Sequence, residues 1–219
     1  MTWNLPNILT VLRLFAAPGV VIMFLYFTRP WADWFALLLF VSAAITDFLD
    51  GYLARAWKQE SKFGAMLDPI ADKAMVVIAL LVITGYAGMD PYILLPATVI
   101  IFREVFVSGL REFLGDTAGT LKVTQLAKWK TTVQMIAISV LFAYGAFYSG
   151  LEASTAGMDE ATVAAIMDGT AEDAFGLRQS ATYATVCLYS GVALLWLAAV
   201  LTGITGWDYF NKAKPYLKD

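Results

Sequence analysis

Four aspartates within a 26-residue stretch are the residues of this sequence best suited to metal chemistry. Asp47 and Asp50 are three residues apart, and Asp68 and Asp72 are four residues apart. On helices, each of these spacings places the two carboxylates of a pair on one face. Four carboxylates brought together repel one another unless a cation holds them, and Mg²⁺ or Mn²⁺ prefers such oxygen ligands. We therefore predict a divalent-metal site formed by all four side chains.

Small residues and an arginine accompany these acids. Gly51 and Ala54 share a helical face with the first pair, and Gly64 shares one with the second, which would leave room for a ligand. Arg55 follows directly and can offer a planar fork of donors to a phosphate. Together these features indicate metal-assisted phosphoryl chemistry. The alternative is that the acids are ion-paired between packed helices, but this segment supplies too few cations to neutralise all four.

The composition is that of an integral membrane protein. Of the 219 residues, 59% are hydrophobic and only 15% are charged, whereas a soluble domain carries about 25% charged residues. The net charge of −3 gives no indication of nucleic-acid binding. The sequence has no histidine, which excludes a Ser-His-Asp triad, a phosphohistidine intermediate and a histidine-ligated metal. Acid–base work is left to Asp, Glu, Lys or Tyr.

Long apolar stretches predict an all-α fold, a polytopic membrane bundle of six transmembrane helices that forms a single domain over residues 1–219. The expected spans are 11–27, 32–54, 64–84, 92–114, 129–149 and 181–206. A short N-terminal segment, residues 1–10, is expected to lie in the membrane interface. Residues 150–180 form an acidic hydrophilic loop, within which 158–167 could form a short surface helix.

The two acid pairs are expected at one membrane surface. The first pair falls at the end of the second span and the second pair at the start of the third, and a short polar link joins these antiparallel helices. Of the 15 lysines and arginines, all but Arg29 and Arg178 fall on that side. The positive-inside rule therefore predicts a protein of the cytoplasmic (inner) membrane, with the acids and both termini facing the cytoplasm and the 150–180 loop facing outward.

The acidic stretch resembles the signature of a known family, the CDP-alcohol phosphatidyltransferases, which reads D-x2-D-G-x2-A-R-x8-G-x3-D-x3-D. Its eight fixed positions are filled by Asp47, Asp50, Gly51, Ala54, Arg55, Gly64, Asp68 and Asp72. The resemblance implies that the four aspartates hold two Mg²⁺ or Mn²⁺ ions beside the pyrophosphate of a CDP-alcohol. It also implies that Asp72 is the general base for the acceptor alcohol, a role for which spacing alone does not separate it from Asp68.

The same resemblance implies where the nucleotide binds and how the chain assembles. The nucleotide contacts would come from Gly51, Ala54, Arg55, Asn7, Thr10 and Ser61. Asn7 could instead cap the first helix, because asparagine is a favoured N-cap residue. The family commonly forms homodimers, so a homodimer is the expected assembly.

Four basic residues near the same surface are candidates for binding the acceptor. Arg103 and Arg111 are eight residues apart on the fourth span, and Lys128 and Lys130 open the fifth. Arginine within an apolar span is usually functional, and snorkelling to lipid headgroups is the alternative. Nearby glutamates, Glu104 among them, could partner the arginines. An anionic acceptor such as a glycerol phosphate would explain this basic cluster.

The runs R-E-V-F-V-S-G-L-R-E and K-W-K-T-T-V-Q-M resemble the branch of the family that uses glycerol 3-phosphate. The implied reaction transfers the phosphatidyl group of CDP-diacylglycerol to sn-glycerol 3-phosphate, giving phosphatidylglycerol phosphate and CMP. Inositol phosphate or phosphatidylglycerol as acceptor remains open. Outside the family, an intramembrane prenyltransferase would need more spans and other acid spacings, and a cation transporter would carry its acids nearer the membrane midplane.

Overall fold

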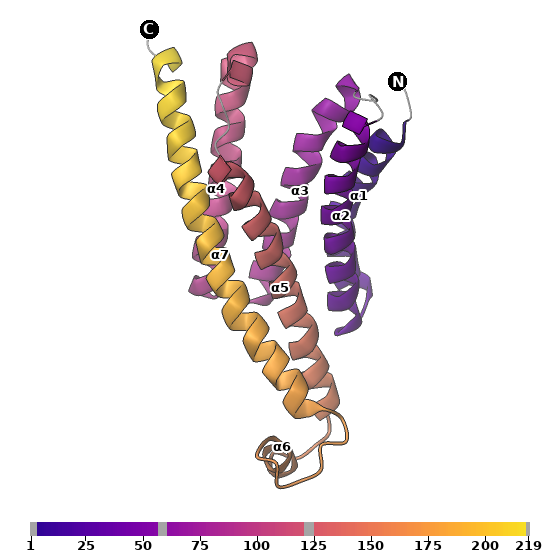
Figure 1. The fold of residues 1–219 in the computed structure, drawn as a ribbon. Coiled ribbons are helices and arrows are strands. Elements are labelled where there is room, and N and C mark those ends of the chain that lie inside the picture. Colours follow the sequence, from indigo (N-terminus) through magenta and orange to yellow (C-terminus); the bar gives the residue numbers. More distant parts are fainter. Residues whose placement is uncertain (1–3, 57–60, 121–124, 218–219) are drawn as a thin grey trace.

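The computed structural model describes residues 4–56, 61–120 and 125–217, apart from the side chains of residues 48–56, 116, 118 and 120. All regular structure in these ranges is helical (Figure 1). The elements are α1 (Leu5–Tyr26), α2 (Trp31–Ala56), α3 (Lys62–Tyr86), α4 (Pro91–Leu114), α5 (Gln125–Thr155), α6 (Glu160–Met167) and α7 (Leu177–Ala213), with 3₁₀ helices η1 (Gly115–Thr120) and η2 (Lys214–Leu217). The predicted all-α class is confirmed.

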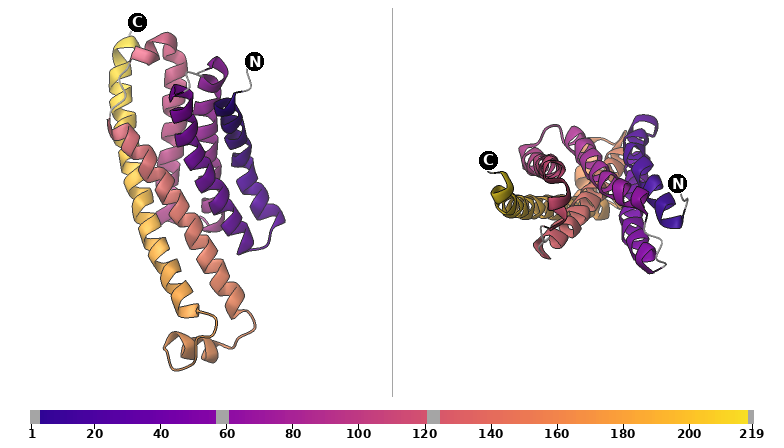
Figure 2. Two further views of the ribbon diagram at one scale, coloured as in Figure 1. Left: turned by 45° about the vertical axis from the view of Figure 1, so that its right-hand side comes forward. Right: turned by 90° about the horizontal axis from the view of Figure 1, so that it is seen from above.

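The helices form an elongated bundle of two groups (Figures 1 and 2). In the first group α1 packs against both α2 and α3, and in the second α7 packs against α4 and α5. Contacts between α2 and α5 join the two groups. The start of α1 and the end of α7 lie at the same end of the bundle, and α6 lies at the opposite end (Figure 1).

Among the described residues, four helical segments are long and apolar enough to cross a membrane: α1, α4, α5, and α7 together with η2. Large apolar side chains cover their outer surfaces, such as Phe15 and Phe102, which are 69% and 68% exposed. Exposed apolar surface on this scale is expected where lipid surrounds a protein. The chain is therefore a multi-pass membrane protein, although the predicted count of six spans is not confirmed.

Over the residues that the structure describes, the predicted N-terminal segment is not separate from the first helix. From Leu5 onward the chain is one continuous helix, so residues 5–10 are the first turns of α1. The local sequence explains this early start. The side chain of Asn4 accepts a hydrogen bond from the backbone N of Asn7 at 3.0 Å, and Pro6 lies in the first turn, where a missing N–H costs nothing.

The fifth and sixth predicted spans lie within longer helices. α5 and α7 extend past 129–149 and 181–206 at both ends, because helical backbone continues beyond the apolar runs that hydropathy detects. The short helix predicted within 158–167 is present as α6. At its start the hydroxyl of Thr162 donates a hydrogen bond to the carboxylate of Asp159, which lowers the pKa of that carboxyl.

Apolar packing between the two groups fixes α3 in place. Fully buried side chains of this core include Phe40 on α2, Leu80 on α3, Ile138 on α5 and Leu195 on α7. Lipid is as apolar as these side chains, so close packing rather than exclusion of water holds such helices together. The core thereby sets the height and rotation of α2 and α3, the two helices that carry the acids.

Candidate functional site

Three buried polar side chains lie on the face of α1 that packs against the acid-bearing helices. Asn7, Thr10 and Arg13 are 2%, 2% and 3% exposed. Their intervals of three residues place them along one side of the helix. Buried polar groups in a membrane helix need partners. The partners of these three side chains lie on α2, on α3 and at the residue that precedes α3.

Arg13 lies between Asp47 and Asp72, one acid from each pair. Its Nη1 donates to Oδ1 of Asp47 on α2 and to Oδ1 of Asp72 on α3, the latter at 2.6 Å. The side chains of Asp47 and Asp72 are 42% and 51% exposed. One carboxylate of each pair therefore converges on a single positively charged group, as the antiparallel arrangement of the two helices predicts.

The other two polar residues of α1 contact the beginning of α3. Oγ1 of Thr10 donates to Oδ1 of Asp68 at 2.7 Å. Oγ of Ser61 donates to Oδ1 of Asn7 at 2.7 Å and accepts from the backbone N of Gly64 at 3.0 Å. Ser61 is thus the N-cap of α3. The alternative that Asn7 caps the first helix is wrong, because Asn7 lies within that helix.

Gly64 is needed for the close approach of α1 to α3. A Cβ at this position would lie 2.8 Å from Oδ1 of Asn7 and 3.3 Å from Oγ of Ser61. The sequence suggested that Gly64 leaves room for a ligand. In the structure, the side chain of Asn7 fills that room.

We expect Gly64→Ala to push Asn7 away from Ser61 and to destabilise the protein by about 1–3 kcal/mol, the usual range for overpacking. Thermal unfolding of the purified protein in detergent measures this. Gly203→Ala on α7 is the control, because a Cβ there would meet no atom within 4 Å. Equal melting temperatures for the two variants would contradict the steric role of Gly64.

The remaining motif residues lie on α2, in the part whose side chains the structure does not describe. They are Asp50, Gly51, Ala54 and Arg55. Their roles in binding metal and nucleotide therefore stay predictions. Among the described side chains, no group of three His, Cys, Asp or Glu residues could hold a metal ion. Asp47 and Asp72 are the two acids of the motif that converge on Arg13.

A second charged cluster lies on α4 and α5. Nζ of Lys130 donates to Oε1 of Glu104, and Nη1 of Arg103 lies 3.3 Å from the same oxygen. All three side chains are largely buried. Gly206 of α7 packs against the arginine, since a Cβ there would lie 2.9 Å from Cγ of Arg103.

The structure does not bring all four predicted acceptor residues together. Arg111 lies over the ring of Tyr209, 5.4 Å from its centroid, and within electrostatic range of Arg103. Lys128 is exposed, whereas Lys130 is buried. Side chains two positions apart on a helix point about 200° apart, because each residue turns the helix by about 100°. Lys128 therefore points away from Lys130, which does not support its predicted role in binding the acceptor, and that role stays a prediction.

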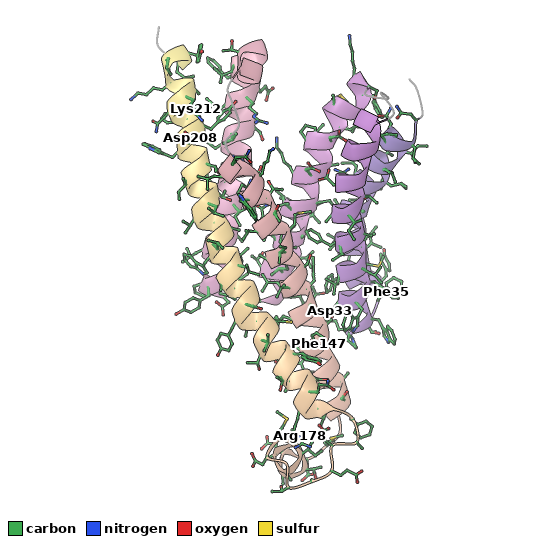
Figure 3. All side chains as sticks on the ribbon, viewed as in Figure 1. Asp33, Phe35, Phe147, Arg178, Asp208 and Lys212 are labelled. Atoms are coloured by element: carbon green, nitrogen blue, oxygen red, sulfur yellow. The ribbon has the colours of Figure 1, made fainter. Side chains whose placement is uncertain are left out.

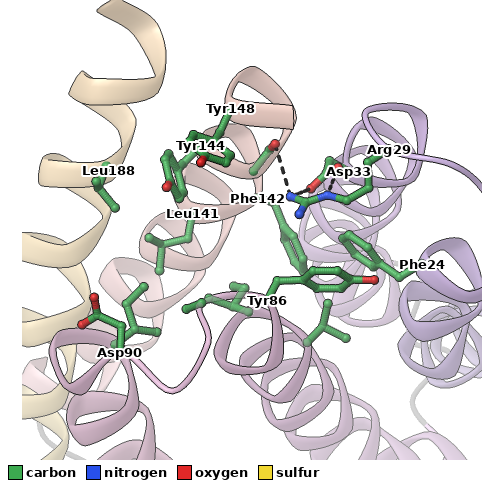
Figure 4. Close-up of a pocket in the computed structure, with 15 residues that line it drawn as sticks. Phe24, Arg29, Asp33, Tyr86, Asp90, Leu141, Phe142, Tyr144, Tyr148 and Leu188 are labelled. Atoms are coloured by element: carbon green, nitrogen blue, oxygen red, sulfur yellow. Dashed lines mark hydrogen bonds and ion pairs between the residues drawn. The ribbon is translucent and has the colours of Figure 1, made fainter. Parts of the chain in front are cut away.

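A cavity of about 290 Å³ lies elsewhere in the bundle, against the Arg29–Asp33 pair near the start of α2 (Figure 4). Arg29 is the one cation among its described lining residues. It donates to both carboxylate oxygens of Asp33 at 2.7 and 2.8 Å and stacks over Tyr86 at 4.7 Å. Because this cation is already neutralised, the cavity is poorly suited to a phosphate, and we do not place the reaction there.

A helical membrane bundle in which one acid from each pair converges across two antiparallel helices is the arrangement that the acidic motif predicts. The chain belongs to the CDP-alcohol phosphatidyltransferase family, whose model matches residues 3–208. The resemblance seen in the acidic motif is confirmed. The prenyltransferase and transporter interpretations are thereby superseded.

Three relatives share one name, CDP-diacylglycerol–glycerol-3-phosphate 3-phosphatidyltransferase. That of Cereibacter sphaeroides is 65% identical over 100% of this chain and 99% of its own length. That of Rickettsia bellii is 38% identical over 97% of each chain. That of Pectobacterium atrosepticum is 43% identical over 64% of this chain and 78% of its own length.

Arg13 is the residue at this site that the sequence interpretation missed. The sequence alone assigns it only to the positive charge of the inner side. Two signals could have revealed more. An arginine early in an apolar span calls for a partner, and Asn7, Thr10 and Arg13 recur at intervals of three on one helical face.

Proposed function

We propose that this protein transfers the phosphatidyl group of CDP-diacylglycerol to sn-glycerol 3-phosphate, forming phosphatidylglycerol phosphate and CMP. The observation that carries the proposal is the convergence of Asp47 and Asp72 on one cation from two helices. The choice of acceptor is supported by the name of the relative that is 65% identical over the whole chain. Inositol phosphate and phosphatidylglycerol remain the alternative acceptors.

The acids suit divalent cations, which this family generally uses. Two carboxylate oxygens from different helices already surround a positive group, and hard divalent ions prefer such oxygens. Asp47, Asp50, Asp68 and Asp72 would hold two ions, Mg²⁺ or Mn²⁺. Bound there, the ions would neutralise the pyrophosphate and the departing CMP.

Asp72 is the proposed general base. As the acceptor oxygen attacks the phosphorus that bears diacylglycerol, its proton passes to the carboxylate of Asp72, and the bond from that phosphorus to the oxygen of CMP breaks. The half-exposed side chain of Asp72 supports access by substrate. Asp68 accepts the hydroxyl of Thr10 and Asp72 accepts the guanidinium of Arg13, so the choice of Asp72 over Asp68 rests on the resemblance to the family.

The nucleotide is assigned to the end of α2, where Gly51, Ala54 and Arg55 follow the first acid pair. The hydroxyls of Thr10 and Ser61 are bonded to Asp68 and Asn7. We therefore give Asn7, Thr10 and Ser61 a supporting role, in which they fix α1 against the start of α3 and so orient the acids.

The acceptor phosphate is assigned to Arg103, Lys130 and Arg111. Arg103, Lys130 and Glu104 are largely buried, whereas Arg111 is exposed. Together the four side chains leave an excess of two positive charges. A phosphate monoester carries a charge of about −1.5 to −2 at neutral pH. The cluster therefore matches the charge of glycerol 3-phosphate, whereas an uncharged alcohol would leave it uncompensated.

Arg103→Ala tests this assignment. We expect the KM for glycerol 3-phosphate to rise roughly 10- to 100-fold, because hydrogen bonds to charged groups contribute about 1.5–3 kcal/mol. The KM for CDP-diacylglycerol should change little. Lys128→Ala removes an exposed cation outside the cluster and should leave both constants near those of the wild type. Unchanged acceptor kinetics in Arg103→Ala and Arg111→Ala would overturn the assignment.

The site is proposed to face the cytoplasm in a single domain with six spans. Figure 3 shows Lys212 toward one end of the bundle and Arg178 at the other, which agrees with the opposite sides to which the sequence assigns them. α2 and α3 contain 26 and 25 residues. At about 1.5 Å per residue, either is long enough to cross a hydrocarbon core of about 30 Å. The homodimer remains a prediction from the family.

A further inference from the structure

Arg13 uses the same carboxylates that the proposed function requires for metal. Its Nη1 donates to Oδ1 of both Asp47 and Asp72, one acid from each pair. The guanidinium is buried, and it comes from α1, a helix outside the family motif. A divalent ion entering between α2 and α3 would meet a cation already in contact with its ligands.

The arginine–aspartate contacts of Arg13 and Arg29 differ in which partner is accessible. In the Arg29–Asp33 pair the carboxylate is 2% exposed, and it also accepts a hydrogen bond from Ser149 at 3.0 Å. The carboxylate of Asp33 is therefore inaccessible to a second cation. At Arg13 the arrangement is reversed, because the arginine is buried and both acids are about half exposed. Asp47 and Asp72 thus stay open to a second cation.

Electrostatics makes the two cations competitors. Without a metal, carboxylates from α2 and α3 repel each other, and one guanidinium between them offsets that repulsion. A divalent ion bound to the same acids would be repelled by the guanidinium at close range. Because a guanidinium cannot give up its charge, it must loosen its contacts with the acids when the ion binds.

We propose that Arg13 is a built-in counter-cation, which holds Asp47 and Asp72 together in the metal-free protein and competes with the divalent ion for them. This rests on the proposed function, since it takes these acids as metal ligands. Arg13 acts through the two aspartates and is therefore a positioning residue. It lets the acid pairs assemble before metal arrives, at the cost of weaker metal binding.

Binding of Mn²⁺ to the purified full-length protein tests this directly. Free Mn²⁺ is measured by electron paramagnetic resonance, and thermal unfolding is recorded with Mn²⁺ and with chelator. For Arg13→Gln we expect Mn²⁺ to bind about tenfold tighter or more, because a nearby like charge is removed. We also expect a lower melting temperature with chelator and a larger rise on adding Mn²⁺ than in the wild type.

Arg29→Gln is the matched control, because it breaks an arginine–aspartate pair in another part of the bundle. It should lower the melting temperature and leave Mn²⁺ affinity unchanged. If Arg13→Gln binds Mn²⁺ no more tightly than the wild type, or stays unfolded even with Mn²⁺, the proposal is overturned. A variant that is folded with Mn²⁺ but unfolds on chelation, while the wild type stays folded, supports it. Absence of Mn²⁺ binding in the wild type would instead refute the metal site of the proposed function.

Discussion

Asp72→Asn is expected to reduce turnover by about 10²- to 10⁴-fold or more, the range associated with loss of a general base. Asparagine has nearly the same shape but cannot accept the proton of the acceptor hydroxyl. Nucleotide binding should remain measurable, because the residues assigned to it lie at the end of α2. CMP release gives turnover, and equilibrium binding of a CDP-alcohol gives the affinity.

The control for this substitution is Asp208→Asn on α7. Asp208 is 43% exposed, close to the 51% of Asp72, and pairs with Lys212 outside the proposed site. Its turnover should match that of the wild type. If Asp72→Asn lost binding and turnover equally, Asp72 would act mainly as a metal ligand. Turnover near the wild-type level would refute both roles.

Removal of divalent metal is expected to abolish the reaction, with a loss on the order of 10³-fold or more. Metal ions contribute several kcal/mol of charge stabilisation in such transfers, and each 1.36 kcal/mol is about tenfold in rate. Without the ions, the charge on the departing CMP would be unopposed. Activity after chelation, and after adding back Mg²⁺ or Mn²⁺, measures the effect.

Thermal unfolding of the chelated protein separates loss of chemistry from loss of fold. Because Arg13 holds Asp47 and Asp72 without metal, the chelated wild type should stay folded, and activity should return with either ion. Full activity in the presence of excess chelator would show that the acids do not need a metal.

Much of the acid site could be predicted because it depends on local sequence. Asp47 lies near the end of one helix and Asp72 near the start of the next, so a short hairpin is enough to bring them together. The buried core then only has to keep α2 and α3 antiparallel. Hydropathy likewise located each long helix but not its ends, since α5 and α7 continue through polar residues.

The contacts made by α1 and α5 could not be predicted in the same way. Arg13 meets Asp47 and Asp72 across 34 and 59 residues of sequence, and Lys130 meets Glu104 across 26. Such pairs depend on the rotation of each helix about its own axis. A shift of two residues along a helix reverses the direction of a side chain, which is why Lys130 is buried whereas Lys128 is exposed.

The proposed function is tested most directly by CMP release from CDP-diacylglycerol. Purified protein in detergent with Mg²⁺ would be given one acceptor at a time: glycerol 3-phosphate, inositol phosphate or phosphatidylglycerol. We predict release with glycerol 3-phosphate, lost on chelation and accompanied by phosphatidylglycerol phosphate. Release only with another acceptor would keep the four-acid mechanism and refute the acceptor. No release with any of them, from protein shown to be folded, would contradict the proposed function.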